Sequence, residues 1–281
     1  MLLSIFVMNQ TMTRRHAINN YRSVVLQLES MEEQQNYYQS QSKVNTKIRT
    51  RSIPTISQLV GSVDNYKCPD GLVIVKDTID SSFFEKSQRR IPKVIHMTSK
   101  TRCMTHSFAT NVDSWRFEGH SLFIHDDDAV GRLLSKWWPE FPNIHDVQNC
   151  MISGAAIADL WRYVILWEYG GIYTDIDNAP GPWLWNETGS VITNTTDALF
   201  EQERDGFPSQ YFFAASSHHP VMYLAVQNAL LRVMEVQSIM KQYVPFVTGP
   251  GAIKSAVVSP FLLSSMPILR DDNILQRSFL H

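Results

Sequence analysis

Apolar residues follow two different spacings along the chain from Ile91 onward. Short runs with the character of buried strands alternate with longer segments whose apolar residues recur three and four positions apart, the spacing of an amphipathic helix. Strands and helices in alternation favour an α/β fold with an open, mainly parallel sheet flanked by helices. The predicted strands are 94–97, 121–125 and 211–215, and the predicted helices are 129–138, 153–169 and 220–234.

The first fifty residues show a different pattern. Residues 1–8 are apolar, but this run is far shorter than the roughly 20 residues that span a bilayer. Residues 29–52 are rich in Gln, Asn, Ser and charged side chains, which is typical of a solvated helix or a flexible spacer. We therefore expect a solvated helical or flexible segment at 1–52, a connecting segment at 53–90 and the α/β domain at 91–281, and the apolar run is too short to be an intact anchor.

The candidate chemistry is concentrated in one stretch of the chain. Apolar spacing predicts a helix that stops at Gly170, and Asp159 and Arg162 lie three residues apart on one face of it. Beyond the helix the sequence alternates as a strand does, so Asp175 and Asp177 are expected to face the same way. Carboxylate oxygens placed in this way suit Mg²⁺ or Mn²⁺, which keep positions for water and substrate phosphates.

This stretch resembles a known family. The patterns Asp-x-x-Arg-Tyr at 159–163, Tyr-Gly-Gly-Ile-Tyr at 169–173 and Asp-x-Asp at 175–177 are similar to the sugar-binding region of the glycosyltransferases grouped as family 32. That group includes the yeast initiating α-1,6-mannosyltransferase, the inositol-phosphoceramide mannosyltransferases and, more distantly, α-1,4-galactosyltransferases and the clostridial glucosylating toxins. Residues 91–96 resemble the family's first strand, and Thr-Gly-Pro at 248–250 resembles its late turn.

The resemblance implies a GT-A-like catalytic domain at 91–281 and gives roles to residues of the shared motifs. Asp177 is expected to hold a Mn²⁺ or Mg²⁺ ion directly, and Asp175 to reach the ribose or sugar and to reach the metal through water. Asp159 is expected to accept hydrogen bonds from the donor sugar's hydroxyls, and Arg162 to donate to them. These four residues are the predicted catalytic residues, and the two of the Asp-x-Asp motif are the predicted metal ligands.

Three further residues of the family pattern, His96, Tyr173 and Gly249, are expected to contact the nucleotide-sugar donor. His96 ends the first strand, where the family places the nucleotide, but a hydrogen-bonded histidine of the core is equally compatible with the sequence. Met97 stands where many relatives carry Gln, and the base is expected to be selected nearby, around 98–101. The resemblance favours GDP-mannose as the donor, with UDP-galactose or UDP-glucose as the alternative.

The predicted function is therefore a retaining glycosyltransferase that moves a hexose to a glycan or glycolipid acceptor. Its relatives in eukaryotes are typically Golgi proteins with a single N-terminal membrane anchor and a polar stem, and this resemblance implies that residues 1–52 are an anchor remnant with a stem. Sequons at Asn9, Asn186 and Asn194 suit a lumenal protein. A glycoside hydrolase is disfavoured, because its two carboxylates flank the bond from opposite sides. An inactive relative that only binds sugar nucleotides stays open, because many relatives continue beyond the Thr-Gly-Pro turn to a terminal segment with His and Trp, whereas this chain stops at His281.

Composition sets limits that agree with this function. A chain of 281 residues with 44% apolar and 11% aromatic residues can bury one sizeable core. The net charge of -2 provides no electrostatic footprint for nucleic acid, and we exclude that partner. Cys68, Cys103 and Cys150 match no metal-ligand spacing. One disulfide with one free thiol and three reduced thiols both fit the sequence.

Other polar and aromatic positions have competing interpretations. The three aspartates at 126–128 resemble a second metal cluster, but Asp128 stands directly before a helical pattern and is more simply an N-cap. The histidine pair at 218–219 could ligate a metal, although a turn before the next helix is favoured. Trp183 and Trp185, which follow the Asp-x-Asp segment, are candidates for stacking on a sugar.

Overall fold

The computed structural model of the protein describes residues 55–63, 66–80, 89–181, 184, 191–202, 208–235, 244–257, 268–269 and 275–277. The chain divides into two compact units, Met1–Ile53 and Pro54–His281, and every described residue belongs to the second. Several predicted features lie outside the described residues: the stem at 1–52, Trp183, Trp185, and the sequons at Asn9 and Asn186.

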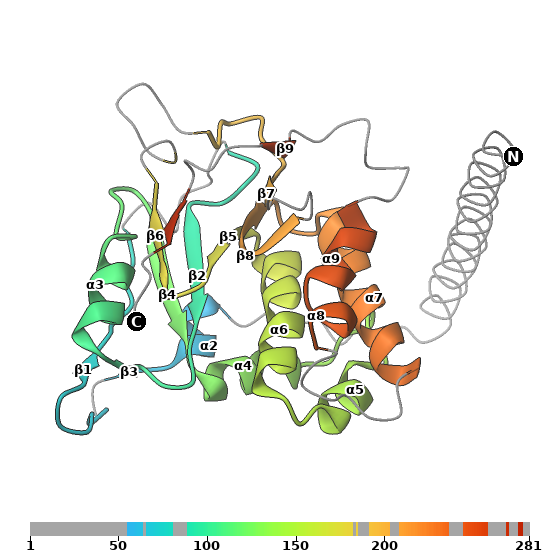
Figure 1. Ribbon diagram of the computed structural model, residues 1–281, viewed down its shortest axis with the longest axis horizontal. Coiled ribbons are helices and arrows are strands. Elements are labelled where there is room, and N and C mark those ends of the chain that lie inside the picture. The colour runs from blue at the N-terminus through green and yellow to red at the C-terminus, as the bar shows by residue number, and fades with distance from the viewer. Residues whose placement is uncertain are drawn as a thin grey trace, which may run out of the picture. The chain divides into compact units, whose positions relative to one another are not determined.

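Helices and strands alternate through most of the described chain (Figure 1). The helices are α2 (Ile56–Val60), α3 (His106–Asp113), α4 (Asp127–Leu134), α5 (Ile144–Cys150), α6 (Gly154–Tyr169), α7 (Pro220–Glu235), α8 (Val244–Val247) and α9 (Pro250–Val257). The strands are β1 (Val73–Ile74), β2 (Val94–Thr98), β3 (Cys103–Met104), β4 (Ser121–His125), β5 (Gly171–Thr174), β6 (Asn178–Pro180), β7 (Ala198–Gln202), β8 (Pro208–Ala215), β9 (Ile268–Leu269) and β10 (Leu275–Arg277). In the part of the chain that the structure describes, no helix combines the length and the apolar character needed to cross a membrane.

The central sheet has the strand order β4-β2-β5-β8-β7-β9. Parallel pairing joins β4 to β2, β2 to β5 and β7 to β9, whereas β8 runs antiparallel to both β5 and β7. Two short antiparallel pairs, β1 with β3 and β6 with β10, lie outside this sheet. The predicted α/β architecture, with an open and mainly parallel sheet flanked by helices, is confirmed.

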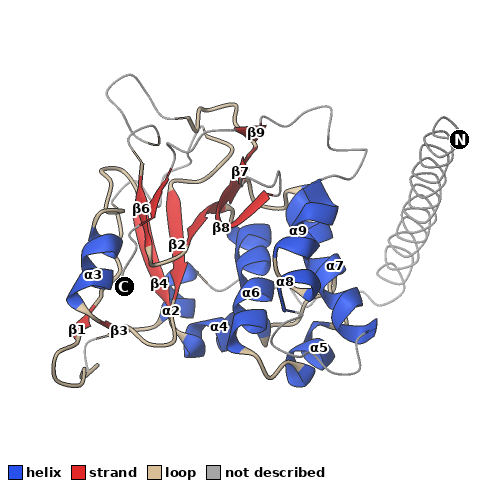
Figure 2. Cartoon of the chain, in the orientation of Figure 1, coloured by secondary structure: helices blue, strands red, loops and turns tan. Residues whose placement is uncertain are grey.

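Alternate residues of the central strands pack into two different layers. Tyr173 and Phe213 join the core formed with α6, α7 and α9, whereas Ile172 and Phe212 join the core on the side of α3. This division follows from the two-residue period of a strand. Figure 2 shows the central strands between α3 on one side and α6, α7 and α9 on the other. Both faces of the central strands are therefore covered, as is usual where parallel strands are joined by helices.

Gly170 and the first residue of β5, Gly171, join α6 directly to that strand. Gly170 and Gly171 have φ values of 64° and 107°, a region that favours glycine. A Cβ at Gly170 would lie 2.6 Å from the backbone N of Ser217, and one at Gly171 would lie 2.6 Å from the backbone O of Val94. Neither position has room for a side chain. The helix predicted at 153–169 is confirmed, and its abrupt end fixes it against the strand that follows.

Part of the range predicted as a connecting segment packs onto the edge of the domain. Thr55 caps α2 through its side chain, which accepts a hydrogen bond from the backbone N of Gln58. Ile56 and Val60 of this helix pack against Val94 and Phe123 of the sheet. The capped helix therefore covers part of the sheet rather than serving only as a spacer.

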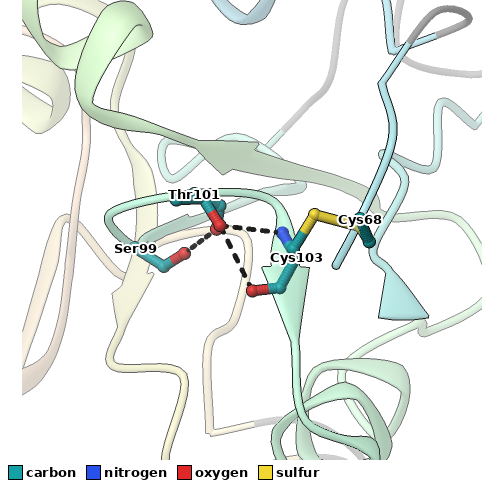
Figure 3. The surroundings of a disulfide bond; sticks show 4 residues. All are labelled: Cys68, Ser99, Thr101 and Cys103. Atoms are coloured by element: carbon teal, nitrogen blue, oxygen red, sulfur yellow. Dashed lines mark hydrogen bonds between the residues drawn. A yellow bond between two sulfur atoms is a disulfide. The ribbon is translucent and has the colours of Figure 1, made fainter. Parts of the chain in front are cut away.

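A disulfide and a buried ion pair hold the segment that follows α2. Cys68 is bonded to Cys103 (Figure 3), and Cys150 is a free, exposed thiol. Arg102, which is fully buried, has its Nη1 3.1 Å from Asp77 Oδ2. Asp77 Oδ1 in turn accepts a hydrogen bond of 2.8 Å from the backbone N of Ile124. The structure thus has one disulfide and one free thiol, the first of the two cysteine states that the sequence allows.

Candidate functional site

Residues of the shared motifs converge where β5 ends and β8 begins. The two strands are antiparallel, and the backbone N of Asp175 donates to the backbone O of Tyr211 at 3.0 Å. Because α6 leads directly into β5, its N-terminal half lies at this same edge of the sheet, beside the start of β8 (Figure 1). Ligands of open α/β sheets bind at the carboxyl ends of the strands. The predicted catalytic residues occupy such an edge.

Asp159 and Arg162 form a buried ion pair on α6. Arg162 Nη2 lies 3.3 Å from Asp159 Oδ1. The same guanidinium donates from Nη1 to the backbone O of Gln210 at 2.7 Å and from Nε to the backbone O of Ala158 at 3.3 Å. Nη1 also lies 3.6 Å from Asp175 Oδ1. Arg162 therefore bridges the carboxylate of the helix and the first carboxylate of the Asp-x-Asp motif.

Burial sets the electrostatics of this pair. It raises the pKa of Asp159 to about 6, although the charge of Arg162 and a hydrogen bond from Thr248 act in the opposite direction. Burial also opposes the charge of Arg162, but the acidic groups around the guanidinium outweigh it, and the pKa of Arg162 is raised. The arginine thus stays cationic, and the aspartate is ionised above about pH 6.

The Asp-x-Asp motif lies in a turn and not in a strand. β5 ends at Thr174, and the backbone N of Asn178 donates to the backbone O of Asp175 at 3.3 Å. The prediction that one strand carries both carboxylates on the same side is therefore wrong, because the backbone turns directly after β5. Tyr173 of β5 donates its hydroxyl hydrogen to Asp175 Oδ1, and its ring centroid lies 4.6 Å from Cζ of Arg162.

Asp175 and Asp177 supply oxygen donors that fit Mg²⁺ or Mn²⁺. The side chain of Asp175 is 35% exposed and Asp177 is exposed, so solvent reaches both carboxylates. Among the residues that the structure describes, no three His, Cys, Asp or Glu side chains gather as one metal-binding group. An ion held by these two residues would need water and substrate phosphate oxygens as further ligands, which is usual for Mg²⁺. Metal binding here stays a prediction.

His96 is fully buried and uses both ring nitrogens within the protein. Nε2 lies 3.1 Å from the backbone O of Gly170 and must donate to it, since a carbonyl only accepts. In the neutral ring Nδ1 then accepts from His125 Nε2 at 3.2 Å. Burial lowers the pKa of His96 to about 4, so the ring is neutral near pH 7. These contacts agree with the interpretation of a core histidine, and the nucleotide contact stays a prediction.

The Thr-Gly-Pro turn between α8 and α9 lies against the ion pair. Thr248 Oγ1 donates to Asp159 Oδ2 at 2.9 Å. The hydroxyl of Tyr163 lies 3.0 Å from the backbone O of Thr248 and 3.1 Å from that of Gly249. A Cβ at Gly249 would lie 2.7 Å from Cα of Pro245. Close packing therefore accounts for this glycine, and its predicted contact with the donor stays a prediction.

Three polar residues of this region escaped the sequence analysis as site residues: Tyr163, Gln210 and Thr248. Tyr163 and Thr248 stand inside the shared motifs, so the family pattern was a signal that could have found them. Gln210 stands in β8 without a motif around it, yet its Nε2 donates to the hydroxyl of Tyr163 at 2.6 Å. No local feature of the sequence indicates that contact.

The remaining polar clusters have structural roles. Asp126 is the N-cap of α4 and accepts a hydrogen bond of 2.9 Å from the backbone N of Ala129, so the cap is two residues earlier than the predicted Asp128. His218 has a φ of 57° in the turn before α7, and its backbone N donates to the backbone O of Trp167 at 2.7 Å. His219 Nδ1 accepts from the backbone N of Val221. The favoured interpretations as a cap and a turn agree with these contacts.

Two curated relatives are mannosyltransferases. The chain is 26% identical over 161 residues to inositol phosphoceramide mannosyltransferase 1 of Schizosaccharomyces pombe, covering 55% of this chain and 47% of that protein. It is 29% identical over 115 residues to inositol phosphoceramide mannosyltransferase 3 of the same species, covering 40% of this chain and 31% of that protein. The chain thus spans about half the length of the first relative and about a third of the second.

Solved structures and a family pattern complete the comparison. The structure of PaToxG glycosyltransferase is similar with a TM-score of 0.43 and 16% identity, covering 62% of this chain and 72% of that one. A mutant transferase is similar with a TM-score of 0.32 and 14% identity, covering 64% and 76%. Residues 5–190, more than half of the chain, match the family described as the glycosyltransferase sugar-binding region containing DXD motif. The chain belongs to this family of glycosyltransferases.

Proposed function

We propose that the protein is a metal-dependent, retaining hexosyltransferase that transfers mannose from GDP-mannose to a glycan or glycolipid acceptor. One observation carries this proposal. Arg162 joins the buried Asp159 to Asp175 of the Asp-x-Asp turn, with distances of 3.3 and 3.6 Å. Groups suited to a sugar and groups suited to a metal-bound diphosphate therefore stand side by side at the edge of the sheet where such folds bind ligands.

The residues divide the work of binding the donor. Asp159 accepts and Arg162 donates hydrogen bonds to the sugar's hydroxyls, which orients the ring. Asp177 and Asp175 would hold Mn²⁺ or Mg²⁺, which when bound would supply Lewis-acid stabilisation of the charge on the nucleoside diphosphate. Tyr173 donates to Asp175 and fixes that carboxylate in place. Retention of the anomeric configuration follows from the resemblance to family 32.

The donor and acceptor classes rest on the relatives. Both curated relatives are named as mannosyltransferases of inositol phosphoceramide, a lipid. Their names support mannose as the sugar and a glycolipid among the acceptors of this chain. UDP-galactose and UDP-glucose remain the alternative donors, because a metal site that holds the diphosphate does not read the base.

We further propose that the enzyme works in the Golgi lumen, held by an N-terminal membrane anchor. Two features support an oxidising, glycosylating compartment. Cys68 and Cys103 form a disulfide, and such bonds persist mainly outside the cytosol. Asn194 of the third sequon is exposed, so a glycan could be attached there. A mass shift on glycosidase treatment of protein expressed in a eukaryotic host tests this compartment, and an Asn194→Gln variant identifies the site.

A thermal-shift screen tests the proposed activity. The protein is heated with GDP, UDP, GDP-mannose, UDP-galactose and UDP-glucose, each with and without Mn²⁺, and turnover of each sugar donor is then measured. We expect Mn²⁺-dependent stabilisation by GDP and turnover of GDP-mannose, since a ligand stabilises the state that binds it. Turnover of UDP-galactose or UDP-glucose alone would show that the donor is a uridine nucleotide sugar and not GDP-mannose. Binding without any turnover would support the alternative that the protein is an inactive relative that only binds sugar nucleotides.

A further inference from the structure

Thr248 has a buried hydroxyl that points at the carboxylate assigned to the donor sugar. We propose that Thr248 is a positioning residue, whose hydroxyl fixes the orientation of the Asp159 carboxylate and thereby places the donor sugar for transfer. This inference rests on the proposed function and adds a residue to its site. It stands on the hydrogen bonds around Asp159 and on the packing of the turn that carries Thr248.

The single hydrogen of this hydroxyl goes to the carboxylate. Thr248 Oγ1 lies 2.9 Å from Asp159 Oδ2 and 3.4 Å from the backbone O of Val244. A hydroxyl donates only one hydrogen bond. The carboxylate is both the nearer and the stronger acceptor, because hydrogen bonds to an ionised oxygen are shorter and stronger than those to a neutral one.

The two oxygens of Asp159 consequently have different partners. Oδ1 faces Arg162 Nη2 at 3.3 Å, and Oδ2 receives the hydroxyl of Thr248. The terminal torsion of an aspartate side chain has a broad, roughly two-fold preference, so one partner alone defines the carboxylate plane poorly. Two partners on opposite oxygens define it well. The lone pairs that remain then point in fixed directions, toward which a sugar hydroxyl can donate.

Thr248 itself is held by the rest of the site. The hydroxyl of Tyr163 is 3.0 Å from the backbone O of Thr248, and Gln210 Nε2 donates to that same hydroxyl at 2.6 Å. The backbone O of Gln210 accepts from Arg162 Nη1 at 2.7 Å, and Arg162 pairs with Asp159. These contacts close a ring of five residues. The close approach of the neighbouring glycine to the backbone of α8 leaves the turn little room to move.

A pair of substitutions separates the hydroxyl from the volume of the side chain. Thr248→Val keeps the shape and removes the donor, whereas Thr248→Ser keeps the donor and removes a methyl group. Thr110→Val makes the same chemical change at an exposed threonine whose hydroxyl donates only within α3. For each variant we measure kcat and KM with the sugar donor that the wild type uses, the affinity for GDP with Mn²⁺, and the folded fraction in urea. Thr248→Ala serves as a second variant without the hydroxyl if the valine variant fails to fold.

We expect Thr248→Val to lower kcat by roughly ten- to a hundredfold, because a misplaced sugar loses the geometry of transfer. GDP, which has no sugar, should bind as it does to the wild type, and Thr248→Ser and Thr110→Val should keep wild-type turnover. Equal turnover of the valine and serine variants would reject the inference while leaving the proposed function intact. Parallel losses of GDP binding and turnover would reject it as well, since they indicate a purely structural role. A wild type that turns over none of the nucleotide sugars would reject the proposed function and this inference together.

Discussion

The two halves of the candidate site differ in how far the protein itself organises them. On the side of α6, the Asp159 side chain is only 8% exposed and belongs to a closed ring of hydrogen bonds. In the turn after β5, the Asp175 side chain is 35% exposed, and Asp177 is exposed. The difference suggests that the sugar meets a surface already formed, whereas the diphosphate meets carboxylates open to solvent that an ion can draw together.

Arg162 connects these two halves. It pairs with Asp159 through Nη2 and approaches Asp175 through Nη1, while the ring of Tyr173 lies beneath its guanidinium. A planar guanidinium suits this role, because its donors diverge in fixed directions. Changes within one half should therefore separate sugar use from nucleotide binding, whereas loss of the arginine should disturb both.

The largest effect is expected in the exposed half. Asp177→Ala should reduce transfer by about a thousandfold, because charge on the departing diphosphate loses the support of its ion. Unfolding free energy should change by less than about 0.5 kcal/mol, since the side chain is exposed. Turnover and urea unfolding check the two expectations. Asp128→Ala removes another exposed carboxylate, in the first turn of α4. It is the matched control and should leave turnover unchanged. Wild-type turnover of the Asp177 variant would remove the metal assignment.

Removal of the Arg162 side chain, which connects the two halves, should have the next largest effect on turnover. Arg162→Ala should lower turnover by about a hundredfold and the unfolding free energy by about 3 kcal/mol, because it leaves the buried Asp159 without its cation. Arg162→Lys should restore only part of either loss, since one ammonium cannot replace the contacts to Asp159, Gln210 and Ala158 together. A lysine variant with wild-type kinetics and stability would show that the site needs only a positive charge, and not the several diverging N–H donors of the guanidinium.

The smallest effect is a pH dependence of the buried half. Burial raises the pKa of Asp159 to about 6, so kcat/KM should fall about tenfold per pH unit below that value as the acceptor is protonated. Stability moves in the opposite direction. The folded pKa exceeds the unfolded value of about 3.9, so this group's contribution to stability is full below about pH 4 and is lost as the pH rises to about 6, by up to about 3 kcal/mol.

Urea unfolding of the wild type and Asp159→Asn across this range checks the sign. The asparagine does not titrate, so the difference in unfolding free energy between the two proteins should follow the pH as described. A difference that stays constant from pH 4 to pH 6 would contradict the raised pKa. An acid limb of kcat/KM that lies well below pH 6 would show that another group limits activity.

Local patterns in the sequence predicted those parts of the site that depend on local order. The helix predicted at 153–169 is observed at Gly154–Tyr169, because its apolar spacing and the glycine that ends it are both local signals. The alternation that predicted a strand through Asp177 is also local, but a turn closed by Asn178 interrupts it. Alternation of apolar and polar residues does not indicate the residue at which a strand ends and a turn begins.

Contacts between residues that are distant in the sequence could not be predicted from local patterns. The hydrogen bond from Thr248 to Asp159 joins positions 89 residues apart, and that from Gln210 to Tyr163 joins positions 47 apart. Neither pair has a periodicity that would bring its members together. The contacts of His96 are another example. The sequence was equally compatible with a core histidine and with a nucleotide contact, and it did not indicate that His125 and Gly170 lie beside the ring.

One binding measurement tests most directly whether the two halves serve different parts of the donor. Isothermal titration in Mn²⁺ compares GDP with GDP-mannose on the wild type, Asp159→Asn and Asp177→Ala. We expect Asp159→Asn to bind GDP as the wild type does but to lose the additional affinity that the mannose provides, whereas Asp177→Ala should lose Mn²⁺-dependent binding of both ligands. Equal losses of GDP and GDP-mannose in Asp159→Asn, or undiminished Mn²⁺-dependent binding in Asp177→Ala, would contradict the division.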